Sequence, residues 1–275
     1  MTESTYVLGE SEAEHRRLMM QGRIARRWSD RFFQTAGLAP GMSVLDLGCG
    51  VGDVSLLVAD IVGPSGRVLG IDRDPVAVER ARARASAQGV REQAAFRVCT
   101  LEAFEAEGPF DAVIGRYILS YQPDPAATLQ KYAQLLHPGG VMAFHEIDLM
   151  IGEPSWPQCQ IWDDAYGLLV QAFEDGQIPL NFGRRLGSVF AEAGLGWPAL
   201  DVIGTSGAGP GSYLYTWLGS SLLGLAPMLR SAGRPVPAGI RLDETLPVQL
   251  EEAVVASGSQ IVGPAQFGAW IRKSS

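Results

Sequence analysis

The run VLDLGCGVGD, from Val44 to Asp53, constrains the fold more than any other part of the chain. Apolar residues lead into Gly48 and Gly50, and a helical pattern follows directly. Glycines at such a junction permit a tight turn and let a ligand approach the backbone closely. The run therefore predicts a strand, a turn and a helix, with the turn beside a bound ligand.

Two aspartates distinguish this turn from a dinucleotide-binding fingerprint. That fingerprint has a third glycine where Asp53 stands. Asp46, two residues before the first glycine, would repel an anionic pyrophosphate and favours a cationic ligand. A dehydrogenase with a nicotinamide cofactor is the competing enzyme class, and both aspartates disfavour it.

A second acidic run, GIDRDP, extends from Gly70 to Pro75. Asp72 ends the next predicted strand, where a carboxylate can accept both hydroxyls of a ribose in a doubly wound sheet. The alternative is that Asp72 caps the helix beginning at Pro75, but Asp74 is better placed for that task. We therefore assign Asp72 to ribose binding.

The rest of the chain alternates between apolar strands and helical patterns up to residue 150. Near-continuous apolar strands at β-α-β spacing are typical of a mostly parallel sheet with helices on both faces, an α/β fold. Predicted strands are residues 43–47, 67–71, 95–98, 111–115, 141–147, 200–203 and 267–271. Predicted helices are residues 10–35, 52–62, the segment from Pro75, 124–136, 155–175 and 184–193. Pro264 suits the start of the last strand or a bulge rather than its interior.

Four motifs together resemble the class I S-adenosylmethionine-dependent methyltransferases. They are VLDLGCGVGD, GIDRDP, FDAVIGR and LLHPGGVMAFHE, within residues 35–150. The likeness is greatest to the small-molecule group with ubiquinone and menaquinone biosynthesis-type enzymes. The opening Tyr6-Val7-Leu8-Gly9, with Arg17-Leu18 and Gln21, is similar to a leader of many bacterial members. The resemblance implies a doubly wound seven-stranded Rossmann-like sheet, its last strand antiparallel, with the cofactor across the carboxyl ends of the early strands.

The resemblance also implies roles for individual residues toward S-adenosylmethionine. Asp46 would lie near the cofactor's ammonium, Asp72 on the ribose and Arg73 beside the adenine. The cofactor-binding set is Gln21, Asp46, Gly48, Cys49, Gly50, Asp72, Arg73, Thr100, Leu101, Glu102 and Arg116. The family commonly has an aspartate where Thr100 stands, so the adenine amino group would bond the Thr100 hydroxyl, Glu102 or a backbone group instead. Arg116, at a strand end, pairs with the methionine carboxylate or an anionic substrate, or is an exposed charge.

Three histidines limit the choice of a general base. His145, near a strand end and followed by Glu146, can take a proton from a substrate hydroxyl, or serve as a structural histidine. Alternation places His145 and Glu146 on opposite faces of the sheet, so at most one lines the pocket. We expect His137 at a helix end and His15 in solvent. Tyr6, Tyr121, Tyr213 and Trp217 are candidate substrate contacts, with core packing as the alternative.

Charge and cysteine content narrow the class of partner. The net charge of −8 and the isoelectric point of about 5.0 disfavour a general nucleic-acid binder. A basic leader leaves RNA methylation as an alternative, although acidic neighbours favour a solvated helix face. Its arginines are Arg16, Arg17, Arg23, Arg26, Arg27 and Arg31.

Three unpaired cysteines and the lack of an apolar leader predict a reduced, cytoplasmic protein with no disulfide. No metal-ligand spacing occurs, so we expect no metal.

The segment from Val202 to Leu229 has no charged residue. Glycines and prolines interrupt it too often for a membrane span. We expect either a lid over an apolar or aromatic substrate, or an insert core that can form a homodimer interface.

The predicted organisation is a helical leader (1–35), a cofactor-binding core (36–150) and a remainder (151–275) with inserts at about 152–180 and 205–258. The expected reaction is methyl transfer to a small molecule by in-line displacement; a non-catalytic cofactor-binding protein is the alternative.

Overall fold

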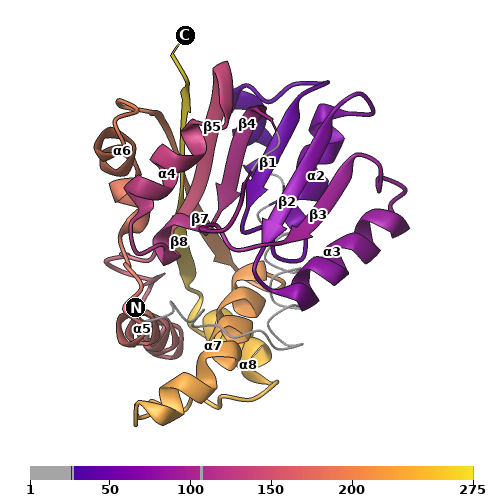
Figure 1. The fold of residues 1–275 in the computed structure, drawn as a ribbon. Coiled ribbons are helices and arrows are strands. Elements are labelled where there is room, and N and C mark those ends of the chain that lie inside the picture. Colours follow the sequence, from indigo (N-terminus) through magenta and orange to yellow (C-terminus); the bar gives the residue numbers. More distant parts are fainter. Residues whose placement is uncertain (1–25, 27, 106–107, 275) are drawn as a thin grey trace. The chain divides into compact units, whose positions relative to one another are not determined.

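The computed structural model describes residues 26, 28–105 and 108–274 (Figure 1). Within them the chain forms two compact units. The sheet unit contains residues up to 146 together with 183–201 and 267–274, and the helical unit contains residues 147–182 and 202–266. Tyr6, His15, Gln21 and four leader arginines (Arg16, Arg17, Arg23 and Arg27) lie outside the described residues.

The sheet has the strand order β3-β2-β1-β4-β5-β8-β6, and β7 also pairs with β8. The strands are β1 (Ser43–Leu47), β2 (Arg67–Asp72), β3 (Ala94–Val98), β4 (Phe110–Arg116), β5 (Leu136–Asp148), β6 (Ser155–Trp156), β7 (Ala199–Ala208) and β8 (Gln260–Arg272). The neighbouring pairs from β3 to β5 are all parallel, whereas β6 runs antiparallel to β8. The mostly parallel α/β sheet is therefore confirmed. It has eight strands instead of seven, because the two-residue β6 adds to its edge.

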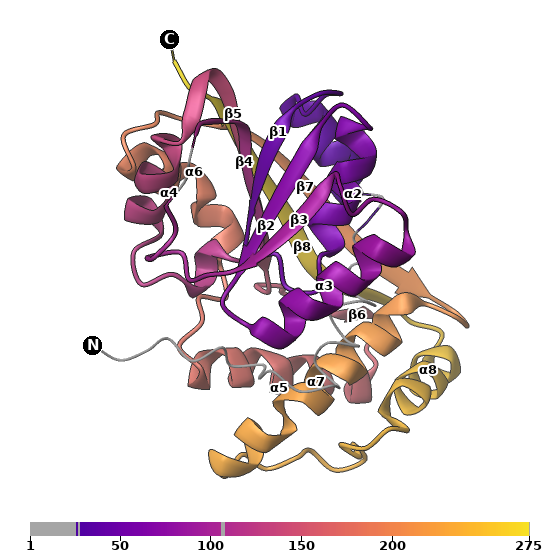
Figure 2. The same ribbon diagram turned by 45° about the vertical axis from the view of Figure 1, so that its right-hand side comes forward.

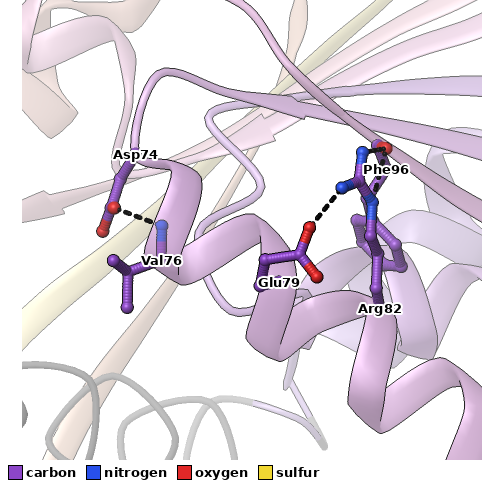
Figure 3. Close-up of polar contacts among 5 residues, drawn as sticks. All are labelled: Asp74, Val76, Glu79, Arg82 and Phe96. Atoms are coloured by element: carbon purple, nitrogen blue, oxygen red, sulfur yellow. Dashed lines mark hydrogen bonds and ion pairs between the residues drawn. The ribbon is translucent and has the colours of Figure 1, made fainter.

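In the sheet unit, parallel strands are followed by the helices α2 (Asp53–Val62), α3 (Pro75–Ala87) and α4 (Pro125–Ala133). Helix α6 (Phe182–Glu192) comes later in the chain, after α5 (Gln160–Asp175), and the unit also has a helical segment at residues 28–36 and the 3₁₀ turn η1 (Leu119–Tyr121). Strand β1 is buried along its whole length, as expected for a strand covered on both faces. Asp74 accepts a hydrogen bond from the Val76 amide at 2.8 Å and caps α3 (Figure 3). The prediction that Asp74 rather than Asp72 is the helix cap is thus confirmed.

The junction between α4 and β5 differs from the prediction. The helix ends at Ala133, and β5 begins at Leu136, so Pro138-Gly139-Gly140 lies inside the strand as a bulge. Tertiary pairing explains the difference, because the Gly139 amide donates to the Lys273 carbonyl and the Lys273 amide donates to the Gly140 carbonyl. His137, predicted at a helix end, is exposed in this bulge.

Later elements also have bounds that the local pattern did not predict. The predicted helix at residues 155–175 is shorter, because Ser155 and Trp156 pair with β8 before α5 (Gln160–Asp175) begins. Strands β7 and β8 extend well beyond residues 200–203 and 267–271. Pro264 therefore lies inside β8, where its carbonyl accepts the Thr205 hydroxyl at 2.9 Å. Pairing between distant segments lengthened both strands beyond their apolar runs.

Three helices pack against one another in the helical unit: α5, α7 (Tyr213–Ser231) and α8 (Leu246–Ser257) (Figure 2). Helix α7 carries most of the uncharged segment and buries Leu214, Tyr215, Trp217 and Leu218. Of the helices in the described residues, none combines the length and apolarity needed to span a membrane.

Candidate active site

The carboxyl ends of the parallel strands gather most of the predicted cofactor residues. Strands β1 and β2 end together, with Leu47 opposite Ile71, so that the glycine-rich turn and Asp72 meet at one edge. Strand β4 ends at Arg116, opposite His145 of β5, which continues to Asp148. Ligands of doubly wound sheets bind at this edge.

The glycine-rich turn directs its amides into the protein. The Cys49 amide donates to the Ile71 carbonyl at 3.0 Å, and the Gly52 amide donates to the Cys49 carbonyl at 2.9 Å. The Gly50 amide donates to the Asp72 carboxylate at 2.8 Å. A phosphate cradle needs such amides to face the ligand. The turn therefore suits a cofactor that does not depend on a pyrophosphate contact here.

Asp72 joins this turn to the start of α3. One carboxylate oxygen accepts the Gly50 amide, and the other accepts the Asp74 amide at 2.9 Å. Burial raises the pKa of the half-buried Asp72 above its ordinary value, and the two amide bonds oppose this shift. A carboxylate has about four acceptor positions, so Asp72 can still accept two ribose hydroxyls.

Asp46 lies beneath the turn, paired with a residue that the sequence analysis missed. Its carboxylate accepts the Ser55 hydroxyl of α2 at 2.5 Å, and both side chains are buried. Burial raises the pKa of Asp46 to about 7, while the Ser55 bond and the Arg116 charge lower it. A side chain at Gly70 would come within 2.8 Å of the Ser55 hydroxyl oxygen. The only available signal for Ser55 was a small polar residue within the apolar run of α2 from Val54 to Ala59.

Two arginines of α3 tie neighbouring elements together. Arg84 donates to the Val51 carbonyl at 2.5 Å and to the Asp53 carboxylate at 2.7 Å. Asp53, which replaces the third glycine of the dinucleotide fingerprint, therefore anchors the turn to α3.

Arg82 connects the same helix to the edge strand β3. It donates twice to the Phe96 carbonyl, at 2.7 and 3.2 Å, and pairs with Glu79 (Figure 3). A side chain at Gly52 would come within 3.1 Å of the Phe96 ring. Arg82 thus holds the strand whose Phe96 packs against the turn.

The predicted adenine loop follows β3. The Cys99 amide donates to the Asp72 carbonyl at 2.8 Å, which keeps the loop beside the end of β2. The Thr100 hydroxyl accepts the Ala103 amide at 3.2 Å, and the Leu101 carbonyl accepts bonds from Lys131 and Tyr132 of α4. Glu102 and Arg73 are exposed. The Thr100 hydroxyl therefore stabilises its own turn, and Glu102 is the exposed acidic side chain of the loop.

Aromatic rings surround His145 at the end of β5. The His145 side chain is fully buried, with ring centroids of Trp28 at 3.8 Å and Tyr117 at 4.8 Å. The guanidinium of Arg116 lies 5.6 Å from the centre of the Tyr117 ring and donates to the Ser29 hydroxyl at 3.4 Å. Arg116 is thus a half-buried side chain held by two neighbours.

Glu146 contacts a different set of groups from His145. It is fully buried, and one carboxylate oxygen accepts the amides of Ile118 at 2.9 Å and Leu119 at 2.8 Å. Burial raises the pKa of Glu146 to about 7, against these hydrogen bonds and one from Ser120. No local sequence pattern indicated this link between Glu146 and the turn after β4. Tyr121 is half-buried in the same turn.

The two other candidate substrate contacts belong to the helical unit. Tyr213 is half-buried, and burial raises the pKa of its hydroxyl above its ordinary value. Trp217 is buried on α7. Among the residues that the structure describes, no three His, Cys, Asp or Glu side chains are grouped so that they could hold a metal ion.

Fold and site together define a doubly wound α/β protein whose strand-end acids suit a nucleoside carrying a cationic group. A family model described as a methyltransferase domain matches residues 38–185, which is more than half of the chain. The chain therefore belongs to this methyltransferase family.

Named relatives agree with this assignment. The chain is 38% identical over 110 residues to aklanonic acid methyltransferase DauC of Streptomyces sp. strain C5, covering 38% of this chain and 47% of that protein. It is 30% identical over 172 residues to demethylmenaquinone methyltransferase of Lactococcus lactis, covering 60% of each. The chain thus spans about half the length of these relatives.

A solved structure supports the fold alone. The phosphoethanolamine N-methyltransferase 2 of Haemonchus contortus, in complex with S-adenosylhomocysteine, superimposes with a TM-score of 0.54 at 16% identity. The likeness covers 90% of this chain and 53% of that one.

Proposed function

We propose that this protein transfers a methyl group from S-adenosylmethionine to a small apolar or aromatic molecule of quinone-like or secondary-metabolite type. The observation that carries the proposal is Asp72, which ends β2, accepts the Gly50 amide and retains acceptor positions for a ribose. The named relatives, which act on aklanonic acid and demethylmenaquinone, support the substrate class. When bound, S-adenosylmethionine supplies an electrophilic methyl group on a sulfonium.

The strand-end residues divide the work of binding. Asp72 accepts the ribose hydroxyls, and buried Asp46, which ionises near pH 7, supplies negative charge beneath the turn toward the ammonium above that pH. Gly48 and Gly50 present backbone without side chains, Cys49 between them keeps its side chain buried, and Arg116 faces the carboxylate. The segment from Thr100 to Glu102, with Arg73, borders the adenine, where exposed Glu102 accepts from the amino group better than the turn-bound Thr100.

Alignment and exclusion of water are the protein's main contributions to in-line displacement, and orientation supplies several kcal/mol. His145 takes the acceptor's proton where the acceptor is a hydroxyl, and the rings of Trp28 and Tyr117 fix its plane. Tyr121, in the turn after β4, contacts the substrate, and substrate contacts by Tyr213 and Trp217 of the helical unit stay a prediction. His145→Ala should slow methyl transfer while leaving S-adenosylhomocysteine affinity near wild type; normal turnover of the variant on the true substrate would make His145 structural.

Calorimetric titration with S-adenosylhomocysteine, alongside NADH, tests the proposed function directly. We expect micromolar affinity for the first ligand and no heat from the second. Screening candidate acceptors by mass spectrometry for the added methyl group then identifies the substrate. Binding of NADH alone would contradict the proposal, and binding of neither ligand would favour a non-catalytic protein of the same fold.

A further inference from the structure

Glu146 holds a conformationally unusual turn at the end of β4. One oxygen of its carboxylate, Oε1, accepts hydrogen bonds from two successive backbone amides, those of Ile118 and Leu119. The residue before them, Tyr117, has a φ of 56°, a left-handed conformation that L-residues with large side chains seldom adopt. Such conformations persist only where surrounding contacts hold them. Glu146 and the bond from the Tyr117 amide to the His145 carbonyl, 2.8 Å long, are among these contacts, beside the packing of the Tyr117 ring against Arg116 and His145.

The turn places Ile118 between two glycines. A side chain at Gly48 would lie 2.5 Å from the Ile118 Cδ1 atom, and one at Gly115 would lie 2.7 Å from its Cγ2 atom. Ile118 therefore fills a slot that exists because both positions lack a side chain. Gly48 has a φ of 65° and opens the glycine-rich turn. A displacement of Ile118 would remove the packing beneath this turn.

We propose that Glu146 is a positioning residue that sets the glycine-rich turn through Ile118, by accepting the Ile118 and Leu119 amides. The assignment rests on the proposed function, in which that turn binds S-adenosylmethionine. It replaces a base role for Glu146 by an acceptor role. An amide oxygen can perform the acceptor role, whereas a proton-accepting base cannot be replaced by an amide.

Three variants separate the two roles. Glu146→Gln keeps an acceptor oxygen, Glu146→Leu removes it, and Ile118→Ala removes the packing while leaving Glu146 intact. Asp111→Leu is the matched control, because Asp111 also accepts a backbone amide between strands, that of Ser43 at 2.8 Å, but at the first residue of β1. The readouts are S-adenosylhomocysteine affinity and amide hydrogen exchange of residues 48–52 and 117–121 without ligand.

We expect Glu146→Gln to bind S-adenosylhomocysteine within about threefold of wild type, and Glu146→Leu and Ile118→Ala to bind about tenfold or more weakly. Exchange should accelerate in residues 48–52 in both weakened variants, and Asp111→Leu should leave it unchanged there. If Glu146→Leu does not fold, Ile118→Ala alone decides whether the slot supports the turn, and Glu146→Gln decides the acceptor role.

Several results would overturn the assignment. One is an Ile118→Ala variant in which the amides of residues 48–52 exchange hydrogen as slowly as they do in wild type. Another is Glu146→Gln with normal affinity but no methyl transfer, which would identify a base. Hydrogen exchange needs no ligand, so it decides the positioning role even if wild-type protein fails to bind S-adenosylhomocysteine and the proposed function falls.

Discussion

At the scale of single residues, the acids beneath the glycine-rich turn serve both architecture and binding. Asp72 accepts hydrogen bonds from the amides of Gly50 and Asp74, so it shapes the glycine-rich turn. The same carboxylate is proposed to bind the ribose beside that turn. Asp46 is buried with Ser55 and has a pKa raised to about 7. Groups with such shifts gather at functional sites.

Replacing Asp72 should therefore weaken cofactor binding more than it weakens the fold. We expect Asp72→Ala to lower S-adenosylhomocysteine affinity about tenfold or more, because ribose acceptors and the Gly50 contact are lost together. Calorimetry measures the loss. The control is Asp74→Ala, which removes the cap of α3 at a cost of about 1 kcal/mol in stability with affinity retained. Equal affinity of Asp72→Ala and wild type would remove the ribose assignment.

The raised pKa of Asp46 predicts how stability depends on pH. The folded protein holds this proton up to about pH 7, whereas the unfolded chain loses it near 3.8. Between these values the unfolded state binds fewer protons, so the free energy of unfolding falls as pH rises. Asp46→Asn should flatten this fall, as measured by urea unfolding at several pH values. The pKa of Glu146 is also raised, so Glu146 makes the free energy of unfolding fall with rising pH in wild type and in Asp46→Asn alike. Parallel curves of unfolding free energy against pH for the two proteins would therefore contradict the raised pKa of Asp46.

At the scale of elements, helix α3 supports the cofactor turn from one side and the turn after β4 supports it from the other. Arg84 bonds Val51 and Asp53, and Arg82 holds Phe96. The helix was predicted from Pro75 at its first turn, but no role was predicted for its arginines. Their carbonyl partners carry no signal in sequence.

Loss of the Arg84 side chain should loosen the turn. We expect Arg84→Ala to cost about 1–2 kcal/mol of stability, since the pair is partly exposed, and to weaken S-adenosylhomocysteine binding severalfold. Urea unfolding and calorimetry provide the two measurements. The exposed Arg91 is the control position, where alanine should change neither quantity. An Arg84→Ala protein with full affinity would show that α3 does not support the turn.

At the scale of the whole molecule, the charge balance governs which partners the protein attracts. The net charge of −8 repels phosphate chains. Two described arginines of the leader, Arg26 and Arg31, pair with Asp60 and Asp201 at 2.6 and 3.1 Å. These pairs offset part of the basic charge that made RNA methylation an alternative.

The protein should accordingly fail to retain RNA near physiological salt. A filter-binding titration against a structured RNA, repeated over a range of salt concentrations, measures this. We expect no retention at about 150 mM salt. Retention that falls steeply as salt rises would instead support an RNA substrate and contradict the small-molecule proposal.

Sequence by itself determined the strand, turn and helix around Gly48, the position of Asp72 at a strand end and the cap at Asp74. Each of these follows from residues close together in the chain, where apolar spacing, glycine and proline act locally. Only the tertiary structure decided that Ser55 pairs with Asp46, that Ile118 fills the slot between Gly48 and Gly115, and that Glu146 holds the turn after β4. Ser55 meets Asp46 because α2 packs back on β1, and the other two contacts join segments that the strand order brings together. No local pattern encodes which side chains meet when elements pack against one another.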